Sequence, residues 1–357
     1  MAPVSPVLIK RLALDVYLAL IVYSEWQPAF KERSHMLYRK FPGTDLLASA
    51  VGMGCWAIGG KWWGDDVEDG NSIACVRAAV ESGITFFDTA PLYGHGHADK
   101  ILVEALGSKR HDVIIATKVG IRFQGTTGHA QSDLSANHVK EDTENSLKRL
   151  RLDTIPLLQI HWPCELGTPL EETMEALLSL QEEGKVRHIG VCNYNAGGMG
   201  EILRHGRVDS LQTPLSMVRK RYGQDLIDVC QSGLQTNTPI GVIGYEPLCR
   251  GLLTGKYASM TTFPPGDVRG QDDWFKGSRF LQVMGLVRYL RQIARKVNTT
   301  PAALAVAWSA AQPGVITSIV GAKRPQQIRE NAAASLLLEK PKIMNVVSQV
   351  VADQPPI

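Results

Sequence analysis

Four polar side chains at the ends of apolar segments form a candidate catalytic set. Asp88, Lys118 and His161 each end a short apolar run, and Tyr93 lies in the loop after Asp88. A free tyrosine has a pKa of about 10, which a neighbouring lysine ammonium lowers, and an aspartate keeps that lysine charged. A histidine can donate a hydrogen bond that orients a carbonyl oxygen. Reduction of a carbonyl by hydride requires an acid, a cation, an anion and a hydrogen-bond donor, and these four side chains supply them.

The elements that must position these residues alternate between strands and helices. Short apolar runs separated by helical patterns are typical of buried parallel strands. In a parallel barrel the strand ends converge on the face that carries the chemistry. Eight strand–helix units therefore predict one α/β domain, a (β/α)8 TIM barrel, with a doubly wound sheet as the alternative. The predicted strands cover residues 51–57, 84–88, 113–118, 154–161, 186–191, 208–212, 240–245 and 315–320.

Helical periodicity and turn residues predict the remaining elements. Two short segments on either side of residues 42–45 predict an N-terminal β-hairpin. The segment 120–131, rich in Gly, Thr and His, is predicted to be a loop, and the long segment 249–279 a functional loop on the C-terminal face. The predicted helices cover residues 71–82, 99–106, 138–150, 170–183, 225–232, 281–297, 301–311 and 325–334, with a shorter one before residue 208.

The composition indicates a globular protein that acts on a small molecule. The 357 residues are 44% apolar and 20% charged, which allows a large core. Lys and Arg number 38 against 35 Asp and Glu, and this balance is too even for a nucleic-acid or membrane surface. The six cysteines form no C-x-x-C pair, which is typical of reduced thiols. We expect a cytoplasmic protein, either a monomer or a weak homo-oligomer.

Residues 1–35 precede the predicted barrel domain, which covers residues 36–357. The run 12–22 is apolar, but Asp15 lies inside it and the run is short for a membrane span. Met36 begins a segment that resembles a natural start. We expect the extension to be dispensable or flexible; a surface helix and a membrane anchor are the alternatives.

Four motifs occur in chain order: Phe87-Asp88-Thr89-Ala90-Pro91-Leu92-Tyr93-Gly94, Ile189-Gly190-Val191-Cys192-Asn193-Tyr194, Tyr245-Glu246-Pro247-Leu248 followed by Gly251-Leu252-Leu253-Thr254-Gly255-Lys256-Tyr257, and Gly321-Ala322-Lys323-Arg324 with Gln327, Glu330 and Asn331. These motifs resemble those of the aldo-keto reductase superfamily. The resemblance extends from about Met36 to the last predicted helix. Its segment 261–269 resembles the bacterial and plant branch, which includes the reductase of the Bacillus inositol-catabolism cluster and general-stress reductases.

This resemblance implies an oxidoreductase that binds NADP(H) in an extended pose at the top of the barrel, without a Rossmann fingerprint. Asp88, Tyr93, Lys118 and His161 match the family's catalytic tetrad, with Tyr93 as the general acid/base. The matching cofactor residues fall into three groups: Asn193, Gln212 and Tyr245 at the nicotinamide; Leu248, Gly251 and Leu253 over the pyrophosphate; and Gly321, Lys323, Arg324, Gln327 and Asn331 near the 2′-phosphate and adenosine.

The phosphate end has a physical argument of its own. Lys323 and Arg324 precede a helix that opens at Pro325, and a helix N-terminus with flanking cations suits a phosphate. The sequence also departs from the family pattern. Asp99 stands where the family has Glu, and Cys192 where it usually has Ser, but neither change removes a tetrad member.

Aromatic residues on strand-end loops suggest where the substrate binds. Trp56, Trp62 and Trp162 are predicted to line the pocket, because aromatic side chains commonly line ligand pockets. His95 and His97 alternate after Tyr93, but no partners stand at ligand spacing, so no metal site is predicted.

Three functions are compatible with these motifs. The first is NADPH-dependent interconversion of an aldehyde or ketone, sugars included, and the corresponding alcohol. The second is an NADP-binding regulatory subunit without significant turnover, as in potassium-channel β subunits of the same fold. The third is an aldolase that forms a Schiff base on Lys118, which would leave Asn193, Gln212 and Tyr245 without a role.

Overall fold

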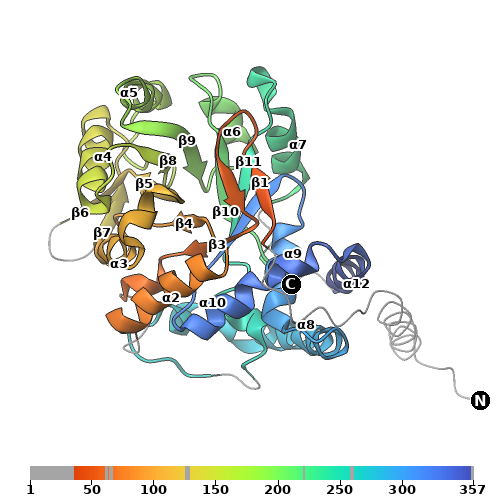
Figure 1. Ribbon diagram of the computed structural model, residues 1–357. Helices are drawn as coiled ribbons and strands as arrows, with labels where there is room; N and C mark the ends of the chain where they lie inside the picture. The colour runs from red at the N-terminus through yellow and green to blue at the C-terminus, as the bar shows by residue number, and fades with distance from the viewer. Residues whose placement is uncertain are drawn as a thin grey trace, which may run out of the picture.

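Eight parallel strands close into a barrel in this computed structural model, and helices surround it (Figure 1). The structure describes residues 36–60, 63, 67–124, 129–219, 222–257 and 261–354, so the extension 1–35 lies outside the described residues. Each barrel strand pairs with the barrel strands before and after it in the chain, and the last pairs with the first, which confirms the predicted (β/α)8 fold. The strands are β3 (Val51–Gly54), β4 (Phe86–Asp88), β5 (Ile114–Val119), β8 (Ile155–Ile160), β9 (Val186–Cys192), β10 (Ser210–Pro214), β11 (Gly241–Tyr245) and β12 (Val315–Val320).

The helices lie close to their predicted positions. Thr300 caps the N-terminus of α9 by accepting a hydrogen bond from the Ala303 amide, and Pro301 stands at its first turn. The helix α12, which packs on α8 and α9, was not predicted. No helix in the described part of the chain is long and apolar enough to cross a membrane. The helices are α2 (Asp69–Glu81), α3 (His97–Leu106), α4 (Ala136–Leu150), α5 (Leu170–Glu182), α6 (Ala196–Ile202), α7 (Gln224–Ser232), α8 (Gly277–Lys296), α9 (Pro301–Ala310), α10 (Pro325–Ala332), α11 (Ala334–Leu337) and α12 (Pro341–Ala352).

The predicted N-terminal hairpin is confirmed, and it closes the base of the barrel. β1 (Tyr38–Lys40) pairs antiparallel with β2 (Leu47–Ser49). Phe41, which follows β1, is fully buried inside the barrel, and its ring centroid lies 6.0 Å from that of Phe86. It also fills the space beside Gly241, the first residue of β11, where a Cβ would lie 2.4 Å from the Phe41 ring. The hairpin is therefore an apolar plug at the N-terminal ends of the strands.

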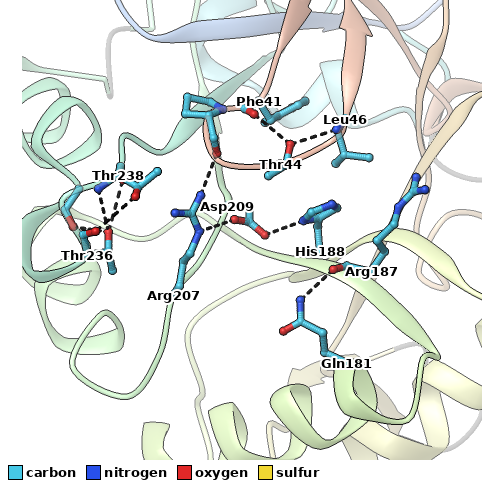
Figure 2. Close-up of polar contacts among 12 residues, drawn as sticks. Phe41, Thr44, Leu46, Gln181, Arg187, His188, Arg207, Asp209, Thr236 and Thr238 are labelled. Carbon is cyan, nitrogen blue, oxygen red and sulfur yellow. Dashed lines mark hydrogen bonds and ion pairs between the residues drawn. The ribbon is translucent and has the colours of Figure 1, made fainter.

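A polar cluster fixes the hairpin turn to the barrel (Figure 2). His188 Nδ1 lies 2.9 Å from Asp209 Oδ2, and His188 Nε2 lies 2.7 Å from Asp45 Oδ1. Arg207 donates from Nε to Asp209 Oδ1 at 2.6 Å and from Nη2 to the Pro42 carbonyl at 2.8 Å. Burial alone would lower the pKa of His188, but the two carboxylates raise it overall. We call Asp45, His188, Arg207 and Asp209 the base cluster.

The prediction of a plain loop over residues 120–131 is wrong. β6 (Ile121–Gln124) pairs antiparallel with β7 (His129–Ser132) to form a small hairpin. Ser132 at its end donates from Oγ to the Trp162 carbonyl at 3.2 Å, so the hairpin supports the turn after β8. The glycines and threonines of this segment favoured a loop, and the alternation of apolar and polar residues extends over only the four residues of β6.

Candidate active site

The four predicted catalytic side chains meet at the C-terminal end of the barrel. Lys118 Nζ lies 2.7 Å from both carboxylate oxygens of Asp88 and 3.1 Å from the Tyr93 hydroxyl. His161 follows β8, and its ring centroid lies 6.0 Å from that of Tyr93. Asp88 and Lys118 are each 1% exposed, so their ion pair is inside the protein. The structure thus brings together the four residues that sequence reasoning selected.

The direction of the hydrogen bond between Lys118 and Tyr93 is fixed by chemistry. A lysine ammonium has only donors, so Lys118 donates and the Tyr93 oxygen accepts. The ammonium also donates to the Thr89 carbonyl at 3.0 Å. This direction leaves the proton of the Tyr93 hydroxyl available to a molecule in front of it.

The protonation states follow from burial and from the charge on Lys118. Burial lowers the pKa of Lys118, but the Asp88 carboxylate outweighs it and raises that pKa overall, so the ammonium persists. Burial raises the pKa of Tyr93 overall, although Lys118 acts in the lowering direction that the sequence analysis expects. Burial, with the nearby ammonium, holds the pKa of His161 well below its usual range, so its imidazole is neutral. Tyr93 is therefore a protonated acid at neutral pH.

A cavity of about 780 Å³ opens beside the tetrad and reaches the start of α10. Tyr93 and His161 lie at one end, and Lys323 lies at the other. Leu253 is instead fully buried, and neither Leu253 nor Arg324 lines the cavity. The predicted cofactor and pocket residues that do line it are Trp56, Trp162, Asn193, Gln212, Tyr245, Leu248, Gly251, Gly321, Lys323, Gln327 and Asn331.

Two amide side chains are oriented at the catalytic end of the cavity. The Gln212 side-chain nitrogen donates to Asp88 Oδ1 at 2.7 Å and to Gln159 Oε1 at 3.4 Å. Both of its hydrogens have an acceptor, so its oxygen is the atom left for a ligand. Asn193 accepts from the Tyr245 hydroxyl at 2.9 Å and donates to the His161 carbonyl at 3.0 Å. Gln159, fully buried on β8, was missed because nothing in its sequence position marks a polar contact.

The far end of the cavity is basic and lies at a helix N-terminus. The Lys323 and Arg324 amides donate to Gln327 Oε1 at 2.9 and 3.2 Å, and α10 begins at Pro325. The Lys323 ammonium donates to the Trp63 carbonyl, which lies across the cavity rim after β3. A cation and a helix N-terminus at one place suit a phosphate.

The described residues between β11 and α8, which begins at Gly277, line the middle of the cavity. The Arg250 guanidinium lies 5.7 Å from the Trp56 ring, and that of Arg269 lies 5.8 Å from the Trp63 ring. Both arginines line the cavity, and so does Lys256. The loop after β11 therefore meets the loop after β3 above the cavity, and it adds three cations that the sequence analysis did not single out.

Two tryptophans near the tetrad, Trp56 and Trp162, lie where they can shape a substrate pocket. The Trp162 ring stacks on that of His161 at 4.1 Å with an interplanar angle of 5°. The Trp56 ring lies 6.4 Å from that of Tyr93. The predicted pocket residue Trp62 lies outside the described residues. Within the described ranges, no group of three His, Cys, Asp or Glu side chains could hold a metal ion.

Comparison with known proteins identifies similar sequences over most of the chain. Residues 50–349 match the model of the Aldo/keto reductase family. The Aldo-keto reductase YhdN of Bacillus subtilis is 33% identical over 326 residues, which cover 90% of this chain and 96% of that protein. The NADH-specific methylglyoxal reductase of Escherichia coli is 33% identical over 303 residues, 82% of this chain and 91% of that protein.

A solved structure has the same fold. The glycerol dehydrogenase AKR11B4 from Gluconobacter oxydans superposes with a TM-score of 0.78 at 33% identity, covering 90% of this chain and 96% of that one.

Proposed function

The chain belongs to the aldo/keto reductase family, and from this premise we propose that it is an NADP(H)-dependent oxidoreductase that interconverts an aldehyde or ketone with the corresponding alcohol. One observation carries the proposal. The hydrogen-bonded chain Asp88–Lys118–Tyr93 ends in a phenol at the wall of the 780 Å³ cavity.

In the reduction direction, Tyr93 gives its proton to the carbonyl oxygen. Its raised pKa keeps the phenol protonated until the oxygen becomes a strong base, and Lys118 stabilises the phenolate that remains. Neutral His161 orients the carbonyl oxygen from the other side. A bound nicotinamide cofactor supplies the hydride to the carbonyl carbon. In the oxidation direction, the same phenolate takes the proton of the alcohol.

The cavity fits such a cofactor at both ends. Asn193, Gln212 and Tyr245 line its catalytic end and would hold a nicotinamide through an amide donor, an amide acceptor and an aromatic ring. Lys323 and the N-terminus of α10 provide a site for a 2′-phosphate, which favours NADP(H) over NAD(H). The NADH specificity named for the Escherichia coli relative makes this preference the point to test.

The pocket walls favour a small carbonyl compound. Trp56 and Trp162 narrow the approach to Tyr93, and the names of two similar proteins specify the small substrates methylglyoxal and glycerol. We therefore expect small polar aldehydes, ketones and sugars to be the best substrates. We also expect a cytoplasmic protein, since all six of its cysteines are free thiols and five of them are buried.

A substrate screen tests this proposal. Loss of NADPH absorbance is followed with a panel of aldehydes, ketones and sugars, and NADH serves as the comparison cofactor. Tight NADPH binding without turnover of any carbonyl would favour the regulatory-subunit alternative instead. The aldolase alternative predicts trapping of a substrate on Lys118 by borohydride, but a Schiff-base lysine needs a lowered pKa and that of Lys118 is raised.

A further inference from the structure

The loop that carries Tyr93 is closed by a buried hydrogen bond between its two ends. Thr89, directly after β4, donates from Oγ1 to Asp99 Oδ1 at 2.6 Å. Asp99 lies in the first turn of α3, and both residues are 0% exposed. The nine residues from Ala90 to Ala98 thus lie between two residues that are hydrogen-bonded to each other.

A second interaction, the ion pair of Asp99 with Arg149, links the closed loop to α4. The other carboxylate oxygen of Asp99 accepts from Arg149 Nε at 2.9 Å, and Arg149 also donates from Nη2 to Ser146 Oγ at 2.8 Å. The stem of Arg149 packs against the end of the loop, because a Cβ on Gly96 would lie 3.0 Å from Arg149 Cδ. Asp99 is therefore a paired buried charge that joins β4, α3 and α4.

The loop needs such support because its backbone is unusual. Gly94, His95 and Gly96 have φ angles of 61°, 54° and 82°, and positive values are unfavourable for a residue with a side chain such as His95. A conformation of this kind persists only when surrounding contacts hold it. Tyr93 directly precedes these three residues, so any relaxation of the loop moves its phenol.

The same threonine also contacts the catalytic lysine. The Thr89 carbonyl accepts from Lys118 Nζ at 3.0 Å, while the Thr89 hydroxyl binds Asp99. We propose that Asp99 is a positioning residue, which acts through Thr89 and with Arg149 to set the contact between Lys118 and Tyr93. This role rests on the proposed carbonyl reduction for its effect on rate. Its effect on loop structure can be measured without any substrate.

The replacement of Thr89 by valine tests the proposal with little change in volume. Thr89→Val removes the hydroxyl and leaves the carbonyl, and Thr89→Ser restores the hydroxyl. The matched control is Thr143→Val, because Thr143 is also fully buried and donates to the Val139 carbonyl at 2.7 Å within α4, away from the tetrad. For each protein we would measure kcat with a good carbonyl substrate, the Kd of NADPH by fluorescence, and amide hydrogen exchange over residues 89–99.

The expected results separate positioning from general stability. Thr89→Val should lower kcat about 10- to 100-fold with NADPH Kd nearly unchanged. Exchange of the Tyr93 and Ala98 amides, which are bonded within the loop, should become roughly tenfold faster or more. Thr89→Ser should recover most of the kcat and most of the slow exchange, and Thr143→Val should change neither kcat nor exchange.

Two outcomes would overturn the proposal. Unchanged kcat and unchanged exchange in Thr89→Val would show that the closure does not position Tyr93. Equal effects of Thr89→Val and Thr143→Val would assign Thr89 to general stability. If the unmodified protein turns over no carbonyl, the proposed function fails, but the exchange experiment still decides whether Asp99 and Thr89 hold the loop.

Discussion

The two ends of the barrel each hold a charged cluster, and they differ in what is left unpaired. At the base, both ring nitrogens of His188 face carboxylates, and Arg207 binds Asp209 and a backbone carbonyl. At the catalytic end, the Tyr93 hydroxyl keeps its proton and the Gln212 side chain keeps its oxygen for the cavity that both residues line. Similar side chains therefore stabilise the fold at one end and leave hydrogen-bonding capacity for a ligand at the other.

The sharpest test of this difference is Tyr93→Phe at the catalytic end. The change keeps the ring and removes the proton donor, so carbonyl reduction should fall about 10²- to 10⁴-fold. NADPH affinity, followed by fluorescence, and the unfolding midpoint should stay close to those of the unmodified protein. A wild-type rate in this variant would remove Tyr93 from the mechanism.

The opposite result is expected for Phe41→Ala at the base. The loss of a fully buried aromatic ring from the barrel interior should lower the free energy of unfolding by about 3–5 kcal/mol. Activity per folded molecule should hardly change. Denaturant unfolding measures the stability, and turnover measures the activity. The control is Leu47→Ala, because Leu47 lies in the same hairpin and is 55% exposed. A large fall in kcat without loss of stability would contradict the division between the two ends.

Lys323→Ala tests the far end of the cavity. Removal of a charged phosphate contact of roughly 1.5–3 kcal/mol should weaken NADPH binding about tenfold or more. NADH lacks the 2′-phosphate, so its affinity should change little. Fluorescence titration with both cofactors measures the two affinities. Equal weakening would mean that the Lys323–Trp63 contact supports the cavity wall instead.

His188→Gln tests whether the base cluster responds to pH. The folded-state pKa of His188 is raised above its unfolded value of about 6.5. Its stabilisation is therefore complete below about pH 6.5 and is lost as pH rises through the raised pKa. We expect the contacts of protonated His188 to contribute up to about 1 kcal/mol to the free energy of unfolding, because solvent screens the 62% exposed Asp45. Unfolding midpoints at several pH values should fall with pH in the unmodified protein more than in His188→Gln, with exposed His111→Gln as the comparison.

The smallest effect is expected when the chain begins at Met36. All eight barrel strands and both strands of the plug lie after residue 35, so we expect solubility and activity to be retained and the melting temperature to change by only a few degrees. Aggregation or loss of activity would show that residues 1–35 belong to the fold, and membrane fractionation of the full chain would test the anchor alternative.

The sequence was sufficient to predict the features that depend on where the barrel strands end. The (β/α)8 fold and the meeting of Asp88, Lys118 and His161 follow from apolar runs that end in polar residues, because parallel strands bring those ends together. Tyr93 also lies where predicted, since only four residues separate it from Asp88.

The features that were missed depend on contacts between loops and helices far apart in the chain. The bond of Thr89 to Asp99 and the pairing of Asp99 with Arg149 join residues 10 and 50 positions apart, and no local pattern encodes them. The sequence analysis expected Lys118 to lower the pKa of Tyr93, but burial raises that pKa overall. Desolvation depends on the surrounding fold, which no local pattern shows. The β6–β7 hairpin escaped detection because each of its strands has only four residues.

The hairpin plug has a consequence for the order in which the molecule is built. The Leu37 amide binds Ser335 Oγ, and Arg39 binds the Ala310 carbonyl, contacts that span 298 and 271 positions. At about 5–20 residues per second, the first strands leave the ribosome roughly 15–60 s before these partners exist. Phe41, which is fully buried in the finished barrel, therefore stays without its final partners for most of synthesis. The earliest part of the fold to be made is among the last to be completed, so a nascent chain that stalls before β12 exposes its plug to chaperones and to other chains.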